Sequence, residues 1–146
     1  MTAKPFVYSD QWADAYFTAK TSDAARRVFS IRFDGQPVGE IQLKRIDFNK
    51  KQAVLSVILS RGEYKNRGFG TEAEALLVSY AFETLGLDTV LADTVLQNTR
   101  SQHVLEKNGF ILTQTDDSFK YYRLDKKRWS DVNRGDTACD VVGRRL

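Results

Sequence analysis

The chain has 146 residues, a length typical of one domain with its own core. Its composition, with 42% hydrophobic and 28% charged residues, is that of a soluble globular protein. It holds a single cysteine, Cys139, and a single histidine, His103, which excludes an internal disulfide and argues against a metal site built from these residues. No apolar run approaches the roughly 20 residues that span a membrane, and the first residues lack a secretory signal, so we expect a cytoplasmic protein.

The formal net charge of +3 is concentrated near the C-terminus, where residues 120–146 hold eight Lys and Arg against four Asp and Glu. A basic segment of this kind is suited to contact nucleic acid. However, the domain lacks the interleaved aromatic and basic residues of a nucleic-acid-binding platform. We therefore expect a solvated basic segment and no nucleic-acid partner.

The N-terminal part of the chain predicts a short helix over residues 11–19, followed by three strands. Residues 28–33 and 38–46 show strand patterns and flank the turn sequence Asp34-Gly35-Gln36-Pro37, which is typical of a hairpin. A second polar turn leads to the apolar residues 54–59. Because both connections are short, the three strands are expected to run antiparallel.

The chain is organised around the next stretch, which predicts a strand, a basic loop with glycines, and a helix. Apolar residues recur at helical spacing from Ala73 to Leu85, and Gly86 supplies a stop. Thr71 and Glu74 have the spacing of a capping box, so the helix is expected to start at the end of the loop.

This arrangement predicts an anion-binding site. The first N–H groups of a helix lack partners within the helix, and they lie at the positive end of its dipole. Gly68 and Gly70 let the backbone approach a ligand closely, so successive N–H groups would hold a phosphate or pyrophosphate. The alternative is a turn in which the glycines serve only to change the chain direction.

The second half of the chain predicts a strand, a helix and a hairpin. Residues 89–96 should form a strand parallel to the preceding one, through a right-handed βαβ crossover. A helix over residues 98–108 is capped by Asn98 and ended by Gly109. A hairpin of residues 110–115 and 119–124 follows.

After Trp129 the sequence loses its periodicity. We therefore expect a single domain over residues 1–129 and a polar, mobile tail over residues 130–146.

The chain resembles the GNAT superfamily of acetyl-CoA-dependent N-acetyltransferases. The resemblance rests on this order of elements and on the segments RGEYKNRGFGTEAEALLVSYAF and NTRSQHVLEKNGF. The chain looks most like the branch that acetylates ribosomal-protein N-termini and small amines. The resemblance covers about residues 28–128. It implies an α/β (α+β) fold: a mixed, mostly antiparallel sheet with a central βαβ crossover and a splayed acetyl-CoA cleft.

The resemblance also implies the residues that contact the coenzyme. The family loop, Q/R-x-x-G-x-G/A, is represented here by residues 65–70, and its amides bind the pyrophosphate of coenzyme A. Lys65 replaces the usual Gln or Arg, which keeps a cation but loses the planar bidentate geometry. The implied contacts are Val57, Ile58 and Leu59 of the splayed strand, Lys65, Asn66, Arg67, Gly68, Phe69, Gly70 and Thr71 of the loop, and Asn98 and Ser101 of the second helix.

The function implied by the resemblance is direct transfer of an acetyl group to a primary amine of a small molecule or a protein N-terminus, without a metal. A carboxylate would take the proton of the amine, and the candidates are Glu40, Glu63 and Asp93. Many family members carry a tyrosine acid seven residues after the asparagine, where this chain has Leu105. That role is vacant or filled elsewhere, with Tyr121 and Tyr122 as the candidate substitutes.

Two other classes of function remain open. Residues 68–73 satisfy the dinucleotide-binding pattern G-x-G-x-x-A, but they do not follow their strand directly or open a repeated βαβ array. A GNAT-like domain that binds acyl-CoA or a protein partner without transferring a group is the other alternative. An exposed strand edge near the C-terminus is compatible with a homodimer.

Overall fold

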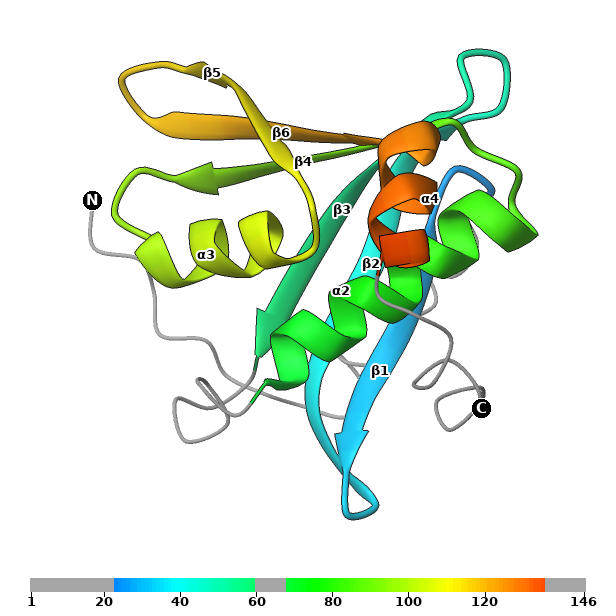
Figure 1. Cartoon of the computed structure of the whole chain (residues 1–146). Coiled ribbons are helices and arrows are strands. Elements are labelled where there is room, and N and C mark those ends of the chain that lie inside the picture. Colours follow the sequence, from blue (N-terminus) through cyan, green and yellow to red (C-terminus); the bar gives the residue numbers. More distant parts are fainter. Residues whose placement is uncertain (1–22, 60–67, 136–146) are drawn as a thin grey trace.

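The computed structural model describes residues 23–59 and 68–135, which form one six-stranded sheet with helices packed on it (Figure 1). The strands are β1 (Arg27–Phe33), β2 (Gln36–Asp47), β3 (Gln52–Leu59), β4 (Thr89–Val95), β5 (Ile111–Thr115) and β6 (Phe119–Asp125). The helices are α2 (Phe69–Ser79), which continues into the π-helical turn η2 (Tyr80–Thr84), α3 (Thr99–Lys107) and α4 (Lys126–Gly135). None of these helices is long and apolar enough to span a bilayer.

The strand order is β1-β2-β3-β4-β6-β5. Among the described strands, the pair β3–β4 is parallel and the other neighbouring pairs are antiparallel. This confirms the expected mixed, mostly antiparallel sheet with a central βαβ crossover. The expected helix over residues 11–19 lies outside the described residues.

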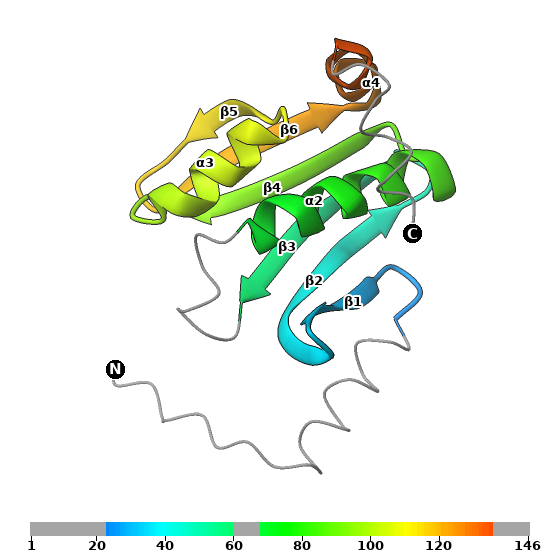
Figure 2. The same cartoon turned by 60° about the horizontal axis from the view of Figure 1, so that its bottom comes forward.

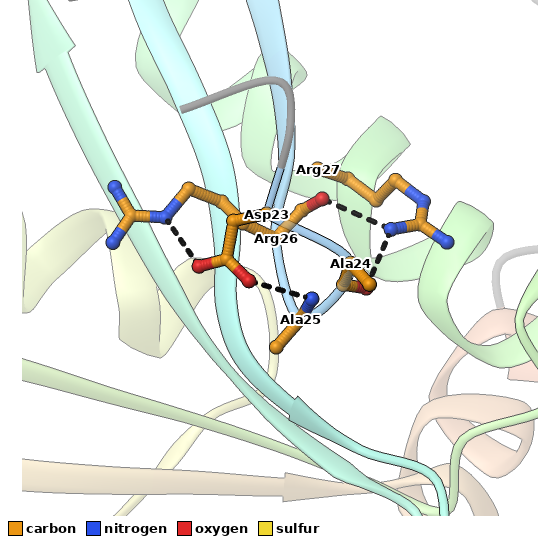
Figure 3. Close-up of polar contacts among 5 residues, drawn as sticks. All are labelled: Asp23, Ala24, Ala25, Arg26 and Arg27. Atoms are coloured by element: carbon orange, nitrogen blue, oxygen red, sulfur yellow. Dashed lines mark hydrogen bonds and ion pairs between the residues drawn. The ribbon is translucent and has the colours of Figure 1, made fainter. Parts of the chain in front are cut away.

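The described chain enters β1 through a turn closed by its own side chains (Figure 3). Asp23 Oδ1 accepts a hydrogen bond from the backbone N–H of Ala25, and Asp23 Oδ2 lies 3.8 Å from Arg26 Nε. The guanidinium of Arg27 donates to the carbonyl oxygens of Ala24 and Arg26. These contacts fix the direction in which the edge strand starts.

The first two connections follow the expected turn chemistry. Asp34 and Gly35 join β1 to β2 with φ angles of 52° and 76°, and positive φ at both central residues suits the twist of a tight hairpin. Asp47 Oδ1 accepts hydrogen bonds from the N–H groups of Asn49 and Lys50 and so closes the turn into β3. The predicted antiparallel order of these three strands is confirmed.

The helix after the loop begins earlier than expected, and the predicted capping box is wrong. The N-cap is Gly68, with φ at 82° and no side-chain cap hydrogen bond, and Thr71 lies inside α2. The Glu74 carboxyl does not turn back to the helix start, because it accepts a hydrogen bond from Asn108 instead. Gly86, with φ at 68°, confirms the expected stop.

α2 and α3 cover one face of the sheet (Figure 2), and the hydrophobic core lies between these helices and that face. The strands contribute Leu43, Leu55, Val90 and Leu124, and the helical layer contributes Leu77, Ala81, Phe82 and Leu105. At the edge, the rings of Phe29 and Tyr80 meet edge to face at 5.3 Å and fasten β1 to the helical layer. Leu76 is one of the apolar residues at helical spacing between Ala73 and Leu85 that were expected to pack on the domain, but it is 51% exposed.

The C-terminal boundary expected at residue 129 is crossed by α4, which continues to Gly135. The ring of Trp129 packs against Phe82 at a centroid distance of 5.2 Å, and Arg128 Nε donates to the carbonyl of Gly109 at 2.7 Å. α4 continues although the apolar periodicity is lost after Trp129, because the contacts of Trp129 and Arg128 hold the helix against the domain. The rest of the expected tail, residues 136–146, lies outside the described residues.

Candidate active site

The parallel strands β3 and β4 separate after three residue pairs, and the separation forms a cleft. Their register runs from Gln52–Thr89 to Val54–Leu91, yet β3 continues to Leu59 and β4 to Val95 (Figure 1). Beyond the split, β3 stays paired with β2 and β4 stays paired with β6. The facing backbone edges of β3 and β4 are therefore not joined to each other beyond this point.

The cleft has a volume of about 230 Å³. Its lining residues come from both strands, from both neighbouring helices and from β6. They are Leu55, Ser56, Val57, Glu74, Ala92, Asp93, Thr94, Val95, Asn98, Ser101, Leu105 and Phe119. Four predicted site residues, Val57, Asp93, Asn98 and Ser101, thus line one cavity.

The start of α2 provides free backbone donors at the end of the basic loop. Gly68, at the N-cap, has no side chain to accept from the helix, so among the described residues the first N–H groups of α2 remain available to a ligand. A Cβ built on Gly68 or Gly70 would meet nothing within 4 Å, so both glycines border open space. Together with the helix dipole, these donors favour an anion.

The N-terminus of α3 forms another wall of the cleft. Asn98 Oδ1 accepts a hydrogen bond from the Ser101 N–H at 3.1 Å, which confirms the predicted cap. Gln102, 8% exposed, donates from Nε2 to the carbonyl oxygens at the end of β4, Val95 and Leu96, and its Oε1 accepts from Lys120 Nζ. This fastening of α3 to the sheet was not predicted from the sequence.

Glu74 is a buried carboxyl in the wall of the cleft that the sequence interpretation did not assign to the site. It is 1% exposed, and its Oε2 accepts a hydrogen bond from Asn108 Nδ2 at 3.4 Å. Burial raises the pKa of Glu74 from its ordinary value of 4.5 to about 8, and the Asn108 hydrogen bond opposes that rise. A carboxyl with this pKa is mostly protonated at neutral pH.

The two candidate base residues in the described chain lie in different places. Asp93 is exposed and lines the cleft on β4. Glu40 lies on β2, two strands from β4, and is not among the residues that line the cleft. Of these two carboxylates, Asp93 has the position that suits direct contact with a substrate in the cleft.

Neither candidate tyrosine lines the cleft. The Tyr121 hydroxyl donates to Asp116 Oδ2 at 2.7 Å, and this hydrogen bond raises the pKa of Tyr121 and lowers that of Asp116. Tyr122 is 1% exposed in the core, its hydroxyl donates to Glu106 Oε1, and burial raises its pKa. Both hydroxyls are engaged elsewhere.

The other predicted site residues lie outside the described residues or do not line the cleft. Lys65, Asn66, Arg67 and the candidate base Glu63 lie outside the described residues. The predicted contacts Leu59 and Phe69 are placed as ends of β3 and α2, and Thr71 lies in the first turns of α2. Ile58 is 56% exposed and does not line the cleft.

A larger hollow of about 700 Å³ lies at the opposite end of β4, between β6 and α4. Two of its lining residues, Arg123 and Asp125, form an ion pair at 2.8 Å, and Asp125 Oδ1 also accepts from the Thr89 hydroxyl. These polar groups satisfy one another, and no predicted site residue lines the hollow. The smaller cleft is the better candidate for a reaction site.

The sequence matches the family model of the acetyltransferase (GNAT) domain over residues 1–111. A spermidine N(1)-acetyltransferase of Escherichia coli K12 is 30% identical over 88 residues, which are 60% of this chain and 47% of that enzyme. The protein YdaF of Bacillus subtilis 168, a proposed ribosomal N-acetyltransferase, is 28% identical over 109 residues, which are 68% of this chain and 59% of that protein. The chain therefore spans about half the length of the curated relatives that it matches.

The fold is also that of solved acetyltransferase structures. The spermidine N-acetyltransferase of Vibrio cholerae in complex with CoA and spermine superposes with a TM-score of 0.74 at 17% sequence identity. The superposition covers 88% of this chain and 81% of that one. At this identity the likeness concerns the fold, which agrees with the split sheet described above.

Proposed function

Because this chain belongs to the GNAT acetyltransferase family, we propose that it transfers an acetyl group from acetyl-CoA directly to a primary amine of a small molecule or a protein N-terminus. The observation that carries the proposal is the cleft between β3 and β4, which lies beside the open N-terminus of α2. An anionic group and an extended arm attached to it would each find suitable backbone donors there.

The residues present suit coenzyme A. The uncapped start of α2, with glycines that border open space, would hold the pyrophosphate through backbone N–H groups. The unjoined edges of β3 and β4 offer backbone donors and acceptors to the amide groups of the pantetheine arm. Asn98 and Ser101 add polar side chains along the same cleft.

The reaction requires a neutral amine, which attacks the thioester carbonyl. Asp93 is our candidate for the group that takes the proton of the amine, because it is an exposed carboxylate in the wall of the cleft. A backbone N–H of β3 would stabilise the negative charge on the carbonyl oxygen. Both roles use groups that the sheet already holds in place.

We propose an aliphatic polyamine as the first acceptor to test. The supporting observation is the similarity to a protein named spermidine N(1)-acetyltransferase, and the V. cholerae structure was solved with spermine. The similarity to YdaF makes a ribosomal-protein N-terminus the second acceptor.

The experiment is a thiol-release assay with acetyl-CoA and, separately, spermidine and N-terminal peptides of ribosomal proteins. Formation of free thiol together with the acetylated amine would establish the transfer. Acetyl-CoA binding without thiol release, with every amine tested, would contradict it.

Such a negative result would support a second function, binding of acyl-CoA without transfer. One observation favours this candidate: the cleft wall carries the apolar Leu105, 2% exposed, and neither Tyr121 nor Tyr122 reaches the cleft. Calorimetry with acetyl-CoA, run beside the thiol assay, separates a binding domain from an enzyme.

We also propose that the edge strand β5 pairs with a second copy of the chain. Among the described strands β5 lies at an edge of the sheet, and its residues Ile111 and Leu112 are 47% and 44% exposed. Apolar side chains on a free strand edge favour association. Light scattering after gel filtration should give the mass of a dimer, and Leu112→Lys should reduce it to that of a monomer.

A further inference from the structure

Glu74 is a carboxyl in an unusual place for a charged residue. It projects from α2 into the wall of the cleft, where it is 1% exposed and shares the cavity with Leu55, Ala92 and Leu105. These neighbours are apolar, and a carboxylate without a cationic partner is expensive to bury among them. A protonated carboxyl avoids most of that cost.

One polar contact holds the group. Asn108, which ends α3, donates from Nδ2 to Glu74 Oε2 at 3.4 Å and to the carbonyl oxygen of Thr71 at 3.2 Å. The amide thereby joins the end of α3 to the start of α2 and fixes the position of the carboxyl between them. A side chain held in this way is ready to act without reorganisation.

The charged groups around Glu74 do not include a described cation that would keep it ionised. On β4, the cleft is lined by Asp93, which is exposed and acidic. On α3, His103 and Lys107 are exposed and do not line the cleft. Glu106 accepts the Tyr122 hydroxyl, and Lys120 of β6 donates to Gln102 and does not line the cleft. The cleft-lining residues of β3 are uncharged, and Glu40, Lys44 and Arg45 of β2 do not line the cleft.

We propose that Glu74 is the catalytic acid, which delivers its proton to the sulfur of coenzyme A as the thioester breaks. The proposal deepens the proposed function and rests on it, because the sulfur is present only if acetyl-CoA occupies this cleft. Asp93 and Glu74 then divide the two proton transfers between an exposed and a buried carboxyl of one cavity.

The step balances in protons and electrons. Attack by the neutral amine forms the C–N bond, and collapse of the tetrahedral adduct breaks the C–S bond, whose electron pair goes to sulfur. The Glu74 proton goes to that sulfur and gives the free thiol, while the nitrogen loses its extra proton to Asp93 or water. Water then returns a proton to Glu74.

The pKa of Glu74 is close to that of the thiol that it would protonate. Burial raises the pKa of Glu74 to about 8, and a free thiol has a pKa of about 8.5. A proton donor is most effective when it is still protonated at working pH and gives up its proton at little cost. A surface glutamate would be ionised and a tyrosine would be a weaker acid, so the buried carboxyl suits this leaving group.

The first test compares Glu74→Gln with the original chain and with Glu83→Gln, which removes an exposed carboxyl at the far end of the same helical segment. With saturating acetyl-CoA, Glu74→Gln should lower kcat on the order of 100-fold near pH 7. The ratio of the original chain's kcat to that of Glu74→Gln should fall as the pH rises through about 8, because ionised Glu74 no longer donates a proton. Glu83→Gln should keep a ratio near one at every pH.

The second test does not depend on turnover or on the folding of the variant. Infrared difference spectra of the original chain between pH 6 and 9 should show loss of the carbonyl band of a protonated carboxylic acid. Coenzyme A should move that transition to higher pH, because it displaces water from the cleft. If the transition is absent, or if it is present but kcat of Glu74→Gln is unchanged, the assignment of Glu74 fails.

These outcomes are distinct from failure of the proposed function. If the original chain does not bind acetyl-CoA or release thiol, the acetyltransferase proposal fails and this one falls with it. If the original chain transfers acetyl groups but the ratio of its kcat to that of Glu74→Gln does not change with pH, only the role of Glu74 is wrong.

Discussion

Val54 and Leu91 are the last residues that pair across the parallel strands β3 and β4. Beyond them each strand keeps its antiparallel neighbour on the outer side, so the sheet continues as two separate halves. The split is what leaves backbone groups available in the middle of a sheet, where they are otherwise used between strands. The cleft depends on this separation.

Replacement of Gly68 by Val should weaken acetyl-CoA binding at least about tenfold, since it places a branched side chain where the backbone meets the ligand and strains a φ of 82°. Gly86→Val is the matched control, because Gly86 has a φ of 68°, open surroundings and a position away from the cleft. Both variants should lose similar stability, and only Gly68→Val should lose affinity in calorimetry. Equal affinity in the two variants would rule out the site.

The stability of the domain should fall as the pH rises from about 4.5 to about 8, through Glu74. The pKa of Glu74 is raised to about 8 in the folded chain against 4.5 when unfolded, so in this window the unfolded chain has released a proton that the folded chain retains. The contribution is fully present below 4.5 and is lost at roughly 1.4 kcal/mol per pH unit until Glu74 ionises. Urea unfolding of Glu74→Gln should show a flatter dependence on pH, and a parallel one would contradict the shift.

Asp93→Asn should lower kcat on the order of 100-fold and leave the acetyl-CoA affinity nearly unchanged, because the carboxylate would act on the amine rather than hold the coenzyme. Asp88→Asn, an exposed change just before β4, serves as the control. An Asp93→Asn enzyme of normal kcat would return the role of base to Glu63 or Glu40.

Tyr121→Phe and Tyr122→Phe should leave the rate and its pH dependence unchanged, since both hydroxyls bond to carboxylates outside the cleft. Rates measured from pH 6 to 10 check this. A falling alkaline limb that disappears in either variant would show that the hairpin supplies the acid instead of Glu74.

Trp129→Ala should lower the free energy of unfolding by about 3 kcal/mol, because the indole packs on Phe82 in the core. A chain that ends at residue 135 should keep its melting temperature, whereas one that ends at residue 125 should lose several degrees. We therefore expect residues 136–146, beyond α4, to be dispensable for stability. A normal melting temperature for the shorter chain would show that α4 adds little.

Local chemistry made much of the fold predictable. Asp34-Gly35 specifies a tight hairpin through residues that tolerate positive φ, and Asn98 caps α3 because its side chain reaches the N–H of Ser101 three residues on. Each signal lies within a few residues of the structure that it determines. The order and direction of the strands followed from these connections.

The missed features depend on residues far apart in sequence. Glu74 was interpreted as a cap partner of Thr71, but its carboxyl bonds to Asn108, 34 residues later, and no local pattern announces that choice. Gln102 likewise ties α3 to Val95 and Lys120 through contacts that exist only in the folded chain. The site was therefore predictable where a backbone motif forms it and unpredictable where side chains from two helices meet.

The π-helical turn η2, at the end of α2, bears on how this chain tolerates changes in its length. A π turn holds one residue more than an α turn between the same two ends. Deletion of the exposed Glu83 or Thr84 would convert it to regular α-helix and leave Phe82 in the core. A deletion within Phe69–Ser79 would instead rotate the following residues by about 100° and turn the wrong face to the sheet. Related chains that differ by one residue in this helix should carry the gap at η2.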